Sequence, residues 1–271
     1  MSIHSSTIED LPSALGDDLA QRLADSRPAV FLDYDGTLTP IVDRPQDATI
    51  SPRMRNVVSS LASRCPVCVV SGRDRRVVQE LMGVDDLVVA GSHGFDIWSP
   101  RLGTIAHDAA SGFEDLLARV TLELEDALAP IEGAVIEPKR ASVAAHYRLV
   151  AEPQRAAVQR VVERLLSEHP DELKVTPGKM VYELQPKLDW DKGRAVLHLL
   201  TTLGLDGDDV VPIYVGDDIT DEHAFEALAG RGIGVIVASA DDREVAGRTT
   251  AADFALESVE EVERFLDGLA R

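Results

Sequence analysis

Short apolar runs separated by helix-like segments constrain the fold of this chain more than any other feature. A strand that is apolar along its whole length has both faces buried, which is typical of a parallel sheet covered by helices on each side. We therefore predict an α/β fold with a Rossmann-like, doubly wound parallel-sheet core. The predicted strands lie at residues 29–33, 67–70, 87–90, 211–215 and 233–237, and the predicted helices at 52–63, 74–82, 191–203, 221–228 and 258–269.

The middle of the chain has a different pattern. Its segments predict the order helix, strand, strand, helix, strand, strand (αββαββ), and the alternation of Val143, Ala145 and Tyr147 suits an antiparallel sheet with one covered face. We interpret this region as an α+β cap domain inserted into the core domain. The predicted organisation is an N-terminal segment at 1–27, a first core segment at 28–105, the inserted cap domain at 106–185 and a second core segment at 186–271.

The charge of the chain limits its partners. Its 47 acidic and 27 basic residues give a formal net charge of −20, which disfavours binding to nucleic acid or to an anionic membrane. The same charge repels an anionic substrate, so a phosphate site would need local cations or a metal ion. The first 25 residues lack the basic start and apolar centre of a secretion signal, and no stretch reaches the ~20 apolar residues of a membrane span. We expect a cytoplasmic protein.

Two cysteines, Cys65 and Cys68, form a CxxC pattern. Such a pattern occurs in redox sites and in half of a zinc site. Here Cys68 falls inside an apolar strand, and residues three apart in a strand point to opposite faces. We therefore expect two reduced, packed cysteines rather than a redox or zinc site.

Acidic and polar side chains follow three of the predicted strands. Asp33 and Asp35 stand in DYDGT after the first strand, and SGR, which begins at Ser71, follows the second. GDDITD follows the strand at 211–215 and supplies Asp217, Asp218 and Asp221. Ligands of open parallel sheets bind beyond the carboxyl ends of the strands, so these groups should meet. Clustered carboxylates need a cation, and hard oxygen ligands without a Cys or His cluster favour Mg²⁺.

The ordered set DYDGT, SGR, the Lys of DWDKG and GDDITD resembles the four motifs of the haloacid dehalogenase superfamily of phosphotransferases. The resemblance implies that Asp33 is a nucleophile that forms an aspartyl-phosphate and that Asp35 is the general acid and base. It implies that Ser71 binds the transferring phosphoryl group and that Lys192 links Asp33 to that group. Mg²⁺ would be held by Asp33, Asp217 and the backbone carbonyl of Asp35, with support from Asp221 and Asp218.

Structural roles are the alternative for each of these residues. Asp33 and Asp35 could be turn or cap residues, and Ser71 could serve only as the N-cap of the helix that begins at 74. Lys192 could be a solvated helix lysine, although a cation in the first turn opposes the helix dipole. Asp217 and Asp218 could likewise be helix caps.

The predicted cap domain carries polar clusters suited to a sugar. Lys179, Val181 and Glu183 share one face of a strand, and a carboxylate and an ammonium together can bind hydroxyl groups. A surface ion pair is the alternative. The segments LDYDGTLTPIV, GSHG, HYR, GKMVYELQP and DKGRAV resemble those of trehalose-6-phosphate phosphatases. This narrower resemblance implies that Lys179 and Glu183 hold the distal glucose. The further candidates for substrate binding are Glu137, Lys139, His146, Arg148 and Arg73.

The resemblance implies a Mg²⁺-dependent hydrolase that converts trehalose 6-phosphate to trehalose and phosphate, with a separate trehalose-phosphate synthase as a partner in trehalose biosynthesis. The alternatives are a phosphatase of another sugar phosphate, such as a sucrose-phosphate or glucosylglycerate-phosphate type, and a non-catalytic sugar-phosphate sensor. A phosphomutase shares the core, but its cap would need more cations than this one carries.

Overall fold

The computed structural model describes residues 6–24, 26–42, 47–105, 112–178, 180–239 and 247–271. The chain divides into two compact units, of which the first comprises Met1–Ile105 with Trp190–Arg271 and the second Ala106–Asp189. The second unit ends four residues beyond the predicted 185. Its last strand, β10, extends to Pro186, and the backbone N–H of Lys187 donates to the carbonyl of Glu172 at 2.7 Å, which keeps these residues with the second unit.

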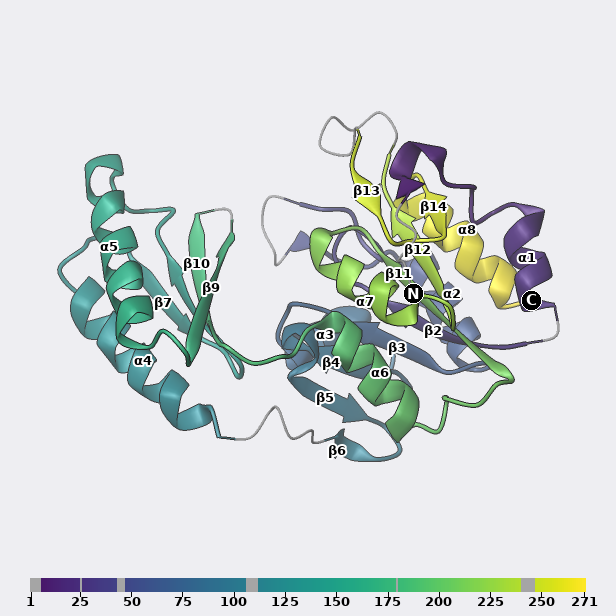
Figure 1. Cartoon of the computed structure of the whole chain (residues 1–271), viewed down its shortest axis with the longest axis horizontal. Coiled ribbons are helices and arrows are strands. Elements are labelled where there is room, and N and C mark those ends of the chain that lie inside the picture. Colours follow the sequence, from purple (N-terminus) through teal and green to yellow (C-terminus); the bar gives the residue numbers. More distant parts are fainter. Residues whose placement is uncertain (1–5, 25, 43–46, 106–111, 179, 240–246) are drawn as a thin grey trace. The chain divides into compact units, whose positions relative to one another are not determined.

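The first unit is built on an eight-stranded sheet (Figure 1). The strands are parallel from β14 through β4, as the apolar runs predict, but β5 and β6 join antiparallel to their neighbours. The sheet is therefore mixed rather than wholly parallel. The strand order is β14 (Phe254–Leu256), β12 (Ile233–Val237), β11 (Val210–Gly216), β2 (Arg27–Leu32), β3 (Val67–Val70), β4 (Val88–Gly91), β5 (Asp96–Ser99) and β6 (Gly103–Ile105).

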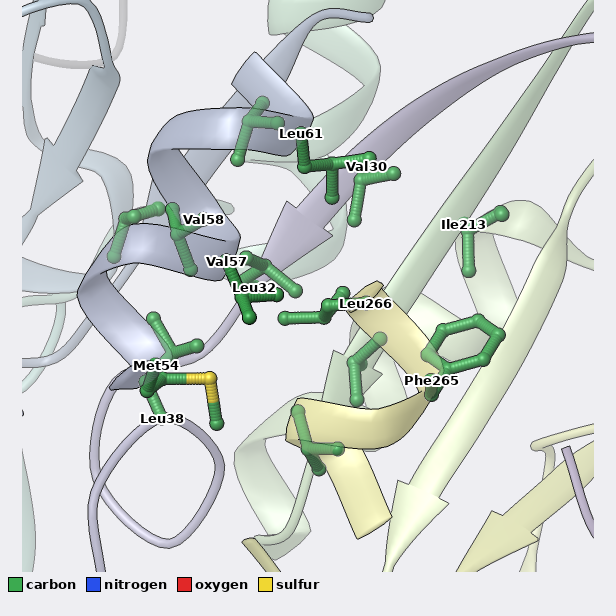
Figure 2. Close-up of a cluster of buried hydrophobic side chains, with 14 of the residues drawn as sticks. Val30, Leu32, Leu38, Met54, Val57, Val58, Leu61, Ile213, Phe265 and Leu266 are labelled. Carbon is green, nitrogen blue, oxygen red and sulfur yellow. The ribbon is translucent and has the colours of Figure 1, made fainter. Parts of the chain in front are cut away.

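Helices cover both faces of this sheet, as expected for strands that are apolar on both sides. On one face, Val30 and Leu32 of β2 pack against α2 and α8, and both side chains are fully buried (Figure 2). On the other face, Tyr214 of β11 meets Phe225 of α7 edge-on, with ring centroids 5.8 Å apart. The helices are α2 (Pro52–Ala62), α3 (Arg75–Met82), α6 (Lys192–Thr202), α7 (Glu222–Leu228) and α8 (Val259–Leu269).

Three helix starts follow directly from local sequence. The side chains of Ser51, Asp191 and Ser258 accept backbone N–H groups at the beginnings of α2, α6 and α8. Such N-cap residues satisfy N–H groups that have no partner within the helix. The cap at Asp191 matters most for the site, because it fixes where α6 begins and thus where Lys192 lies.

The described residues of the predicted N-terminal segment pack into the first unit. Its helix α1 (Asp17–Leu23) places Leu19, which is 3% exposed, in the same hydrophobic cluster as α2 and α8. Its short strand β1 (Ser6–Thr7) pairs antiparallel with β13 (Thr249–Thr250). Within the described ranges, no helix combines the length and the apolar character needed to span a membrane.

The second unit has the predicted order of elements. Its strands form one antiparallel sheet in the order β7, β8, β10, β9. From the sequence we predict the first helix at Ala109–Leu128; Ala109 lies outside the described residues, and the structure describes this helix from Glu114. The elements are α4 (Glu114–Leu128), β7 (Val135–Pro138), β8 (Val143–His146), α5 (Glu152–Glu168), β9 (Leu173–Gly178) and β10 (Val181–Pro186).

Both cysteines are free thiols, as predicted. Cys68 is buried inside β3, and Cys65 precedes that strand and is half-buried. Burial raises the pKa of Cys65 to about 11 and raises that of Cys68 as well. Both thiols therefore stay protonated at neutral pH, which argues against redox chemistry at this pair.

Candidate active site

Asp33 lies at the carboxyl end of β2 and is held on both carboxylate oxygens. Its backbone N–H still continues the sheet by donating to Val215. One carboxylate oxygen accepts the backbone N–H of Tyr34 at 2.7 Å, and the other lies 2.9 Å from the Nζ of Lys192. Burial raises the pKa of Asp33 to about 7, against the opposing effect of Lys192 and with a further increase from Asp221.

Lys192 is a buried cation between two carboxylates. It is 2% exposed and lies 2.9 Å from Asp33 and 2.7 Å from Asp221. Although burial alone would lower the pKa of Lys192, the two carboxylates raise it above its usual value. The lysine is therefore charged and enclosed, which excludes the interpretation of a solvated helix lysine.

Within the part of the chain that the structure describes, the Asp221 carboxylate accepts hydrogen bonds from four donors. One oxygen accepts from Lys192 and from the hydroxyl of Tyr214 at 2.6 Å, and the other accepts the backbone N–H groups of Asp217 and Asp218 at 3.1 and 3.0 Å. With both oxygens engaged, Asp221 orients Lys192 and the turn after β11 rather than offering a lone pair to a ligand. Tyr214 was missed from the sequence, because nothing distinguishes a tyrosine in an apolar strand from an ordinary core residue.

Asp217 completes the acidic group. Oxygens of Asp33, Asp217 and Asp221 lie within 4.8 Å of one another, an arrangement that could hold a metal ion. Burial raises the pKa of Asp217 to about 8, with further increases from Asp33 and Asp221. A Cβ on Gly36 would lie 1.9 Å from a carboxylate oxygen of Asp217, and Gly36 has a φ of +72°, so only glycine suits this turn.

Asp35 has a different environment from Asp33, two residues away. Its carboxylate makes a two-pronged ion pair with Arg73, in which Nε and Nη2 lie 2.6 and 2.5 Å from its two oxygens. The same guanidinium lies over the ring of Tyr34, 5.5 Å from its centroid. Arg73 follows β3, so the ion pair joins the polar ends of two neighbouring strands. The sequence placed Arg73 at this edge but did not indicate Asp35 as its partner.

Ser71 and Asp218 also lie at this edge of the sheet. Ser71 is 1% exposed, and the N-cap of α3 is Asp74, not Ser71, because the Asp74 side chain accepts the N–H of Arg76. The N-cap interpretation of Ser71 is therefore wrong. Asp218, in contrast, is exposed and its side chain caps the short turn Ile219–Asp221.

The second unit contains a separate polar network on its sheet. Glu183 of β10 accepts a hydrogen bond from Ser142 at 2.6 Å and lies 3.3 Å from the Nζ of Lys139, while Glu137 of β7 lies 2.8 Å from His146 of β8. Glu137 and Glu183 both stand opposite Ala144 in the register, so the two carboxylates lie on one face. The sequence also predicts Arg148 and Lys179 as substrate-binding residues. Arg148 is exposed after β8, and Lys179 lies outside the described residues.

A central parallel strand that is followed by DYDGT, with a lysine from a later helix bound to the first aspartate, defines the haloacid dehalogenase class of fold. Within that class, the family model described as trehalose-phosphatase matches residues 31–260, so the chain belongs to the trehalose-phosphatase family. The conclusion agrees with the motifs found in the sequence, and it rests on most of the chain rather than on those motifs alone.

Individual relatives support the same family. The trehalose-phosphate phosphatase of Mycobacterium tuberculosis is 42% identical over 267 residues, which cover 98% of this chain and 66% of that protein. The chain thus spans slightly less than two thirds of the length of this curated relative. A crystal structure of Aspergillus fumigatus trehalose-6-phosphate phosphatase is 29% identical, with 96% of this chain and 98% of that chain covered and a TM-score of 0.67. The C-terminal domain of the Candida albicans trehalose-6-phosphate phosphatase has a TM-score of 0.74 over 96% of this chain and 98% of that chain and, at 23% identity, shares the fold.

Proposed function

We propose that the chain is a Mg²⁺-dependent phosphatase that hydrolyses trehalose 6-phosphate through an aspartyl-phosphate on Asp33. The observation that supports this most strongly is the buried Asp33 carboxylate, bound to Lys192 and next to Asp217, in a chain of the trehalose-phosphatase family. The names of its relatives supply the substrate. The chemistry comes from the residues at the ends of β2, β3 and β11.

The first half-reaction transfers the phosphoryl group to Asp33. A carboxylate oxygen of Asp33 forms a bond to phosphorus, the bond from phosphorus to the sugar oxygen breaks, and that oxygen leaves with the proton of Asp35. Lys192 offsets the repulsion between the Asp33 carboxylate and the phosphoryl oxygens. The buried Ser71 hydroxyl would donate a hydrogen bond to the transferred group.

The second half-reaction releases phosphate. Asp35 takes a proton from water as the water oxygen attacks phosphorus, and the bond between phosphorus and the Asp33 oxygen breaks. Asp35 is thereby protonated again and ready for the next substrate. For each proton transfer, one oxygen of the Asp35 carboxylate must be released from Arg73 while the other can stay bound, and the phosphoryl oxygens would offer the guanidinium an alternative partner.

The acidic group fits a hard divalent cation. Burial raises the pKa values of Asp33 and Asp217, and neighbouring carboxylates raise them further, so a divalent cation at this position would favour the charged form of both groups. Asp33 and Asp217, with the backbone carbonyl of Asp35, would hold Mg²⁺, whereas Asp221 is already saturated by four donors. When bound, the ion would neutralise charge on the phosphoryl oxygens.

The second unit is the proposed reader of the sugar. Glu137 and Glu183 present two carboxylates on one sheet face, with Lys139 and His146 as their partners, and such groups hydrogen-bond readily to the many hydroxyls of a disaccharide. Lys179 and Arg148 remain candidates on the strength of the sequence pattern. Glu183 is the best placed for a test, because contacts with Ser142 and Lys139 hold its carboxylate in position.

The supply of substrate belongs to the same proposal. Trehalose 6-phosphate would come from a separate trehalose-phosphate synthase, and the reaction would take place in the cytoplasm, where free thiols such as Cys65 and Cys68 persist. A pull-down with a trehalose-phosphate synthase tests for a lasting complex, and detection of the chain in a cell fraction outside the cytoplasm would contradict the location.

Phosphate release from a panel of esters tests the function. The panel contains trehalose 6-phosphate, sucrose 6-phosphate, glucosylglycerate phosphate and p-nitrophenyl phosphate, each with Mg²⁺ and with EDTA. We expect trehalose 6-phosphate to be the best substrate and EDTA to abolish turnover. Preference for another sugar phosphate would retain the chemistry and discard the substrate, and sugar-phosphate binding without turnover would indicate a sensor.

A substitution at the nucleophile tests the chemistry itself. Asp33→Asn should abolish turnover of every ester, because an amide cannot form the acyl phosphate. The matched control is Asp209→Asn, at an exposed aspartate that lies 3.0 Å from Arg27, and it should leave turnover unchanged. Near wild-type turnover by Asp33→Asn would refute the assignment.

A further inference from the structure

The turn that follows β4 has an unusual backbone. Ser92 and His93 both have positive φ angles, of 51° and 56°. Residues other than glycine rarely adopt this left-handed backbone conformation. Two successive residues with this strained backbone are stable only where contacts with the surrounding structure hold them in place. Strained positions of this kind cluster at functional sites. His93 has no part in the phosphoryl-transfer steps proposed for Asp33, Asp35 and Lys192. Those steps therefore do not explain why the turn adopts this backbone conformation.

The turn is fixed by the loop that carries Ser71 and Arg73. The N–H of Ser92 donates to the carbonyl of Arg73 at 2.7 Å, and the N–H of His93 donates to the carbonyl of Ser71 at 2.8 Å. A buried ion pair between Arg75 and Asp96, 3.0 Å long, ties the flanking segments together. Backbone hydrogen bonds therefore join the two segments beyond Val70 and Ala90, where the pairing of β3 and β4 ends.

The imidazole of His93 lies against Gly72, between the two residues that the loop presents. A Cβ on Gly72 would lie 2.8 Å from the Cε1 and 2.9 Å from the Nε2 of His93. The φ of Gly72 lies outside the left-handed region, so its backbone conformation does not explain a glycine at this position. The close approach of the His93 ring does explain it.

We propose that His93 is a positioning residue whose ring presses on Gly72 and thereby fixes the Ser71 hydroxyl and the Arg73 guanidinium. Through Arg73, it sets the orientation of the Asp35 carboxylate, which Arg73 holds by two hydrogen bonds. The inference rests on the proposed phosphatase function. Because the ring acts on the phosphoryl side of the site, its effect should be the same for every phosphate ester, with or without a second sugar.

The first test removes the ring and keeps the backbone. Asn tolerates the left-handed region, so His93→Asn should fold normally. We expect kcat to fall by roughly 10- to 100-fold, because a small misplacement of catalytic groups has effects of that size. The loss should be equal for trehalose 6-phosphate and p-nitrophenyl phosphate, with KM and the melting temperature nearly unchanged. The control is His169→Asn, at a half-buried histidine that contacts Glu172 and should have no effect.

The second test uses the contact itself. Gly72→Ala adds a methyl group where the ring lies and should lower kcat, whereas the same change in a His93→Gly background should have a much smaller effect. Such coupling in a double-mutant cycle is evidence that the two positions interact. Equal effects of Gly72→Ala in both backgrounds would overturn the proposal.

Other outcomes distinguish a failure of the role proposed for His93 from a failure of the proposed phosphatase function. A wild-type protein that hydrolyses p-nitrophenyl phosphate but not trehalose 6-phosphate contradicts the function and leaves the His93 test intact. If neither ester is hydrolysed, stabilisation by inorganic phosphate with Mg²⁺ replaces turnover as the measurement, and His93→Asn should reduce it. A loss confined to trehalose 6-phosphate would make His93 a reader of the sugar, and no loss in any assay would leave it without a role. Either result overturns the proposal.

Discussion

The substitution Lys192→Met tests whether the buried lysine compensates Asp33 and Asp221. Methionine fills a similar volume but removes the cation, so two buried carboxylates lose their shared partner. Removing one member of a buried ion pair costs about 3–5 kcal/mol. The control is Arg27→Met, because Arg27 pairs with Asp209 where both side chains are more than half exposed, and such pairs contribute less than about 1 kcal/mol.

The cost of Lys192→Met in the free energy of unfolding should depend on pH. Burial already raises the pKa of Asp33 to about 7, and loss of Lys192 should raise it further. Between the unfolded pKa of 3.8 and the folded pKa, the folded protein then binds a proton that the unfolded chain has released, so the free energy of unfolding falls as pH rises. The cost of the substitution should therefore be larger at pH 8 than at pH 5.

Urea unfolding in EDTA at several pH values measures this free energy directly. Saturating Mg²⁺ should restore some of the lost stability at pH 8, because the ion supplies a cation to the same carboxylates. A cost below about 1 kcal/mol at pH 8, or a cost that does not change between pH 5 and pH 8, would refute the reasoning, since it falls short of the 3–5 kcal/mol expected for a broken buried pair.

Three further predictions concern other regions of the molecule. Gly36→Ala should raise the Mg²⁺ concentration needed for half-maximal turnover, because its Cβ would lie 1.9 Å from Asp217; an unchanged requirement would contradict this. Without metal, wild-type stability in urea should fall from pH 4 to pH 8, since the pKa values of Asp33 and Asp217 are raised from 3.8 to about 7 and about 8; a rise would contradict the sign. Glu183→Gln should reduce turnover of trehalose 6-phosphate by about tenfold or more, the equivalent of one charged hydrogen bond, and spare p-nitrophenyl phosphate; equal losses would indicate a structural role.

The core of the fold could be predicted because its signals are local. The apolar runs at β2, β3 and β11 identify buried strands without knowledge of their neighbours, and residues at the carboxyl ends of parallel strands necessarily converge. Asp33 was singled out on this basis and Lys192 from the resemblance of DWDKG to a superfamily motif, and the structure places the Lys192 Nζ 2.9 Å from the Asp33 carboxylate. The antiparallel hairpin of β5 and β6 was missed because Asp96–Ser99 is too short and too mixed in polarity to differ from a loop.

Pairings between distant segments could not be predicted. Arg73 and Asp35 both stand at strand ends, but nothing in their sequence neighbours specifies a two-pronged ion pair. The contact of His93 with Gly72 likewise depends on the geometry of two loops. Such contacts are decided by packing after the sheet has formed, so a single sequence gives the positions of these residues along the strands but not their partners.

The three acids of GDDITD illustrate how burial separates residues of the same type. Asp218 is exposed and caps a turn, and Asp221 is fully buried with four donors on its carboxylate. Between these extremes, the Asp217 carboxylate receives, within the described residues of the chain, one long hydrogen bond of 3.4 Å from the Thr37 hydroxyl. A partly buried carboxylate with so few donors is costly in its charged form unless a cation approaches it. Of the three, Asp217 is therefore the one that we propose as a direct metal ligand, because a bound cation would offset the cost of its charged form.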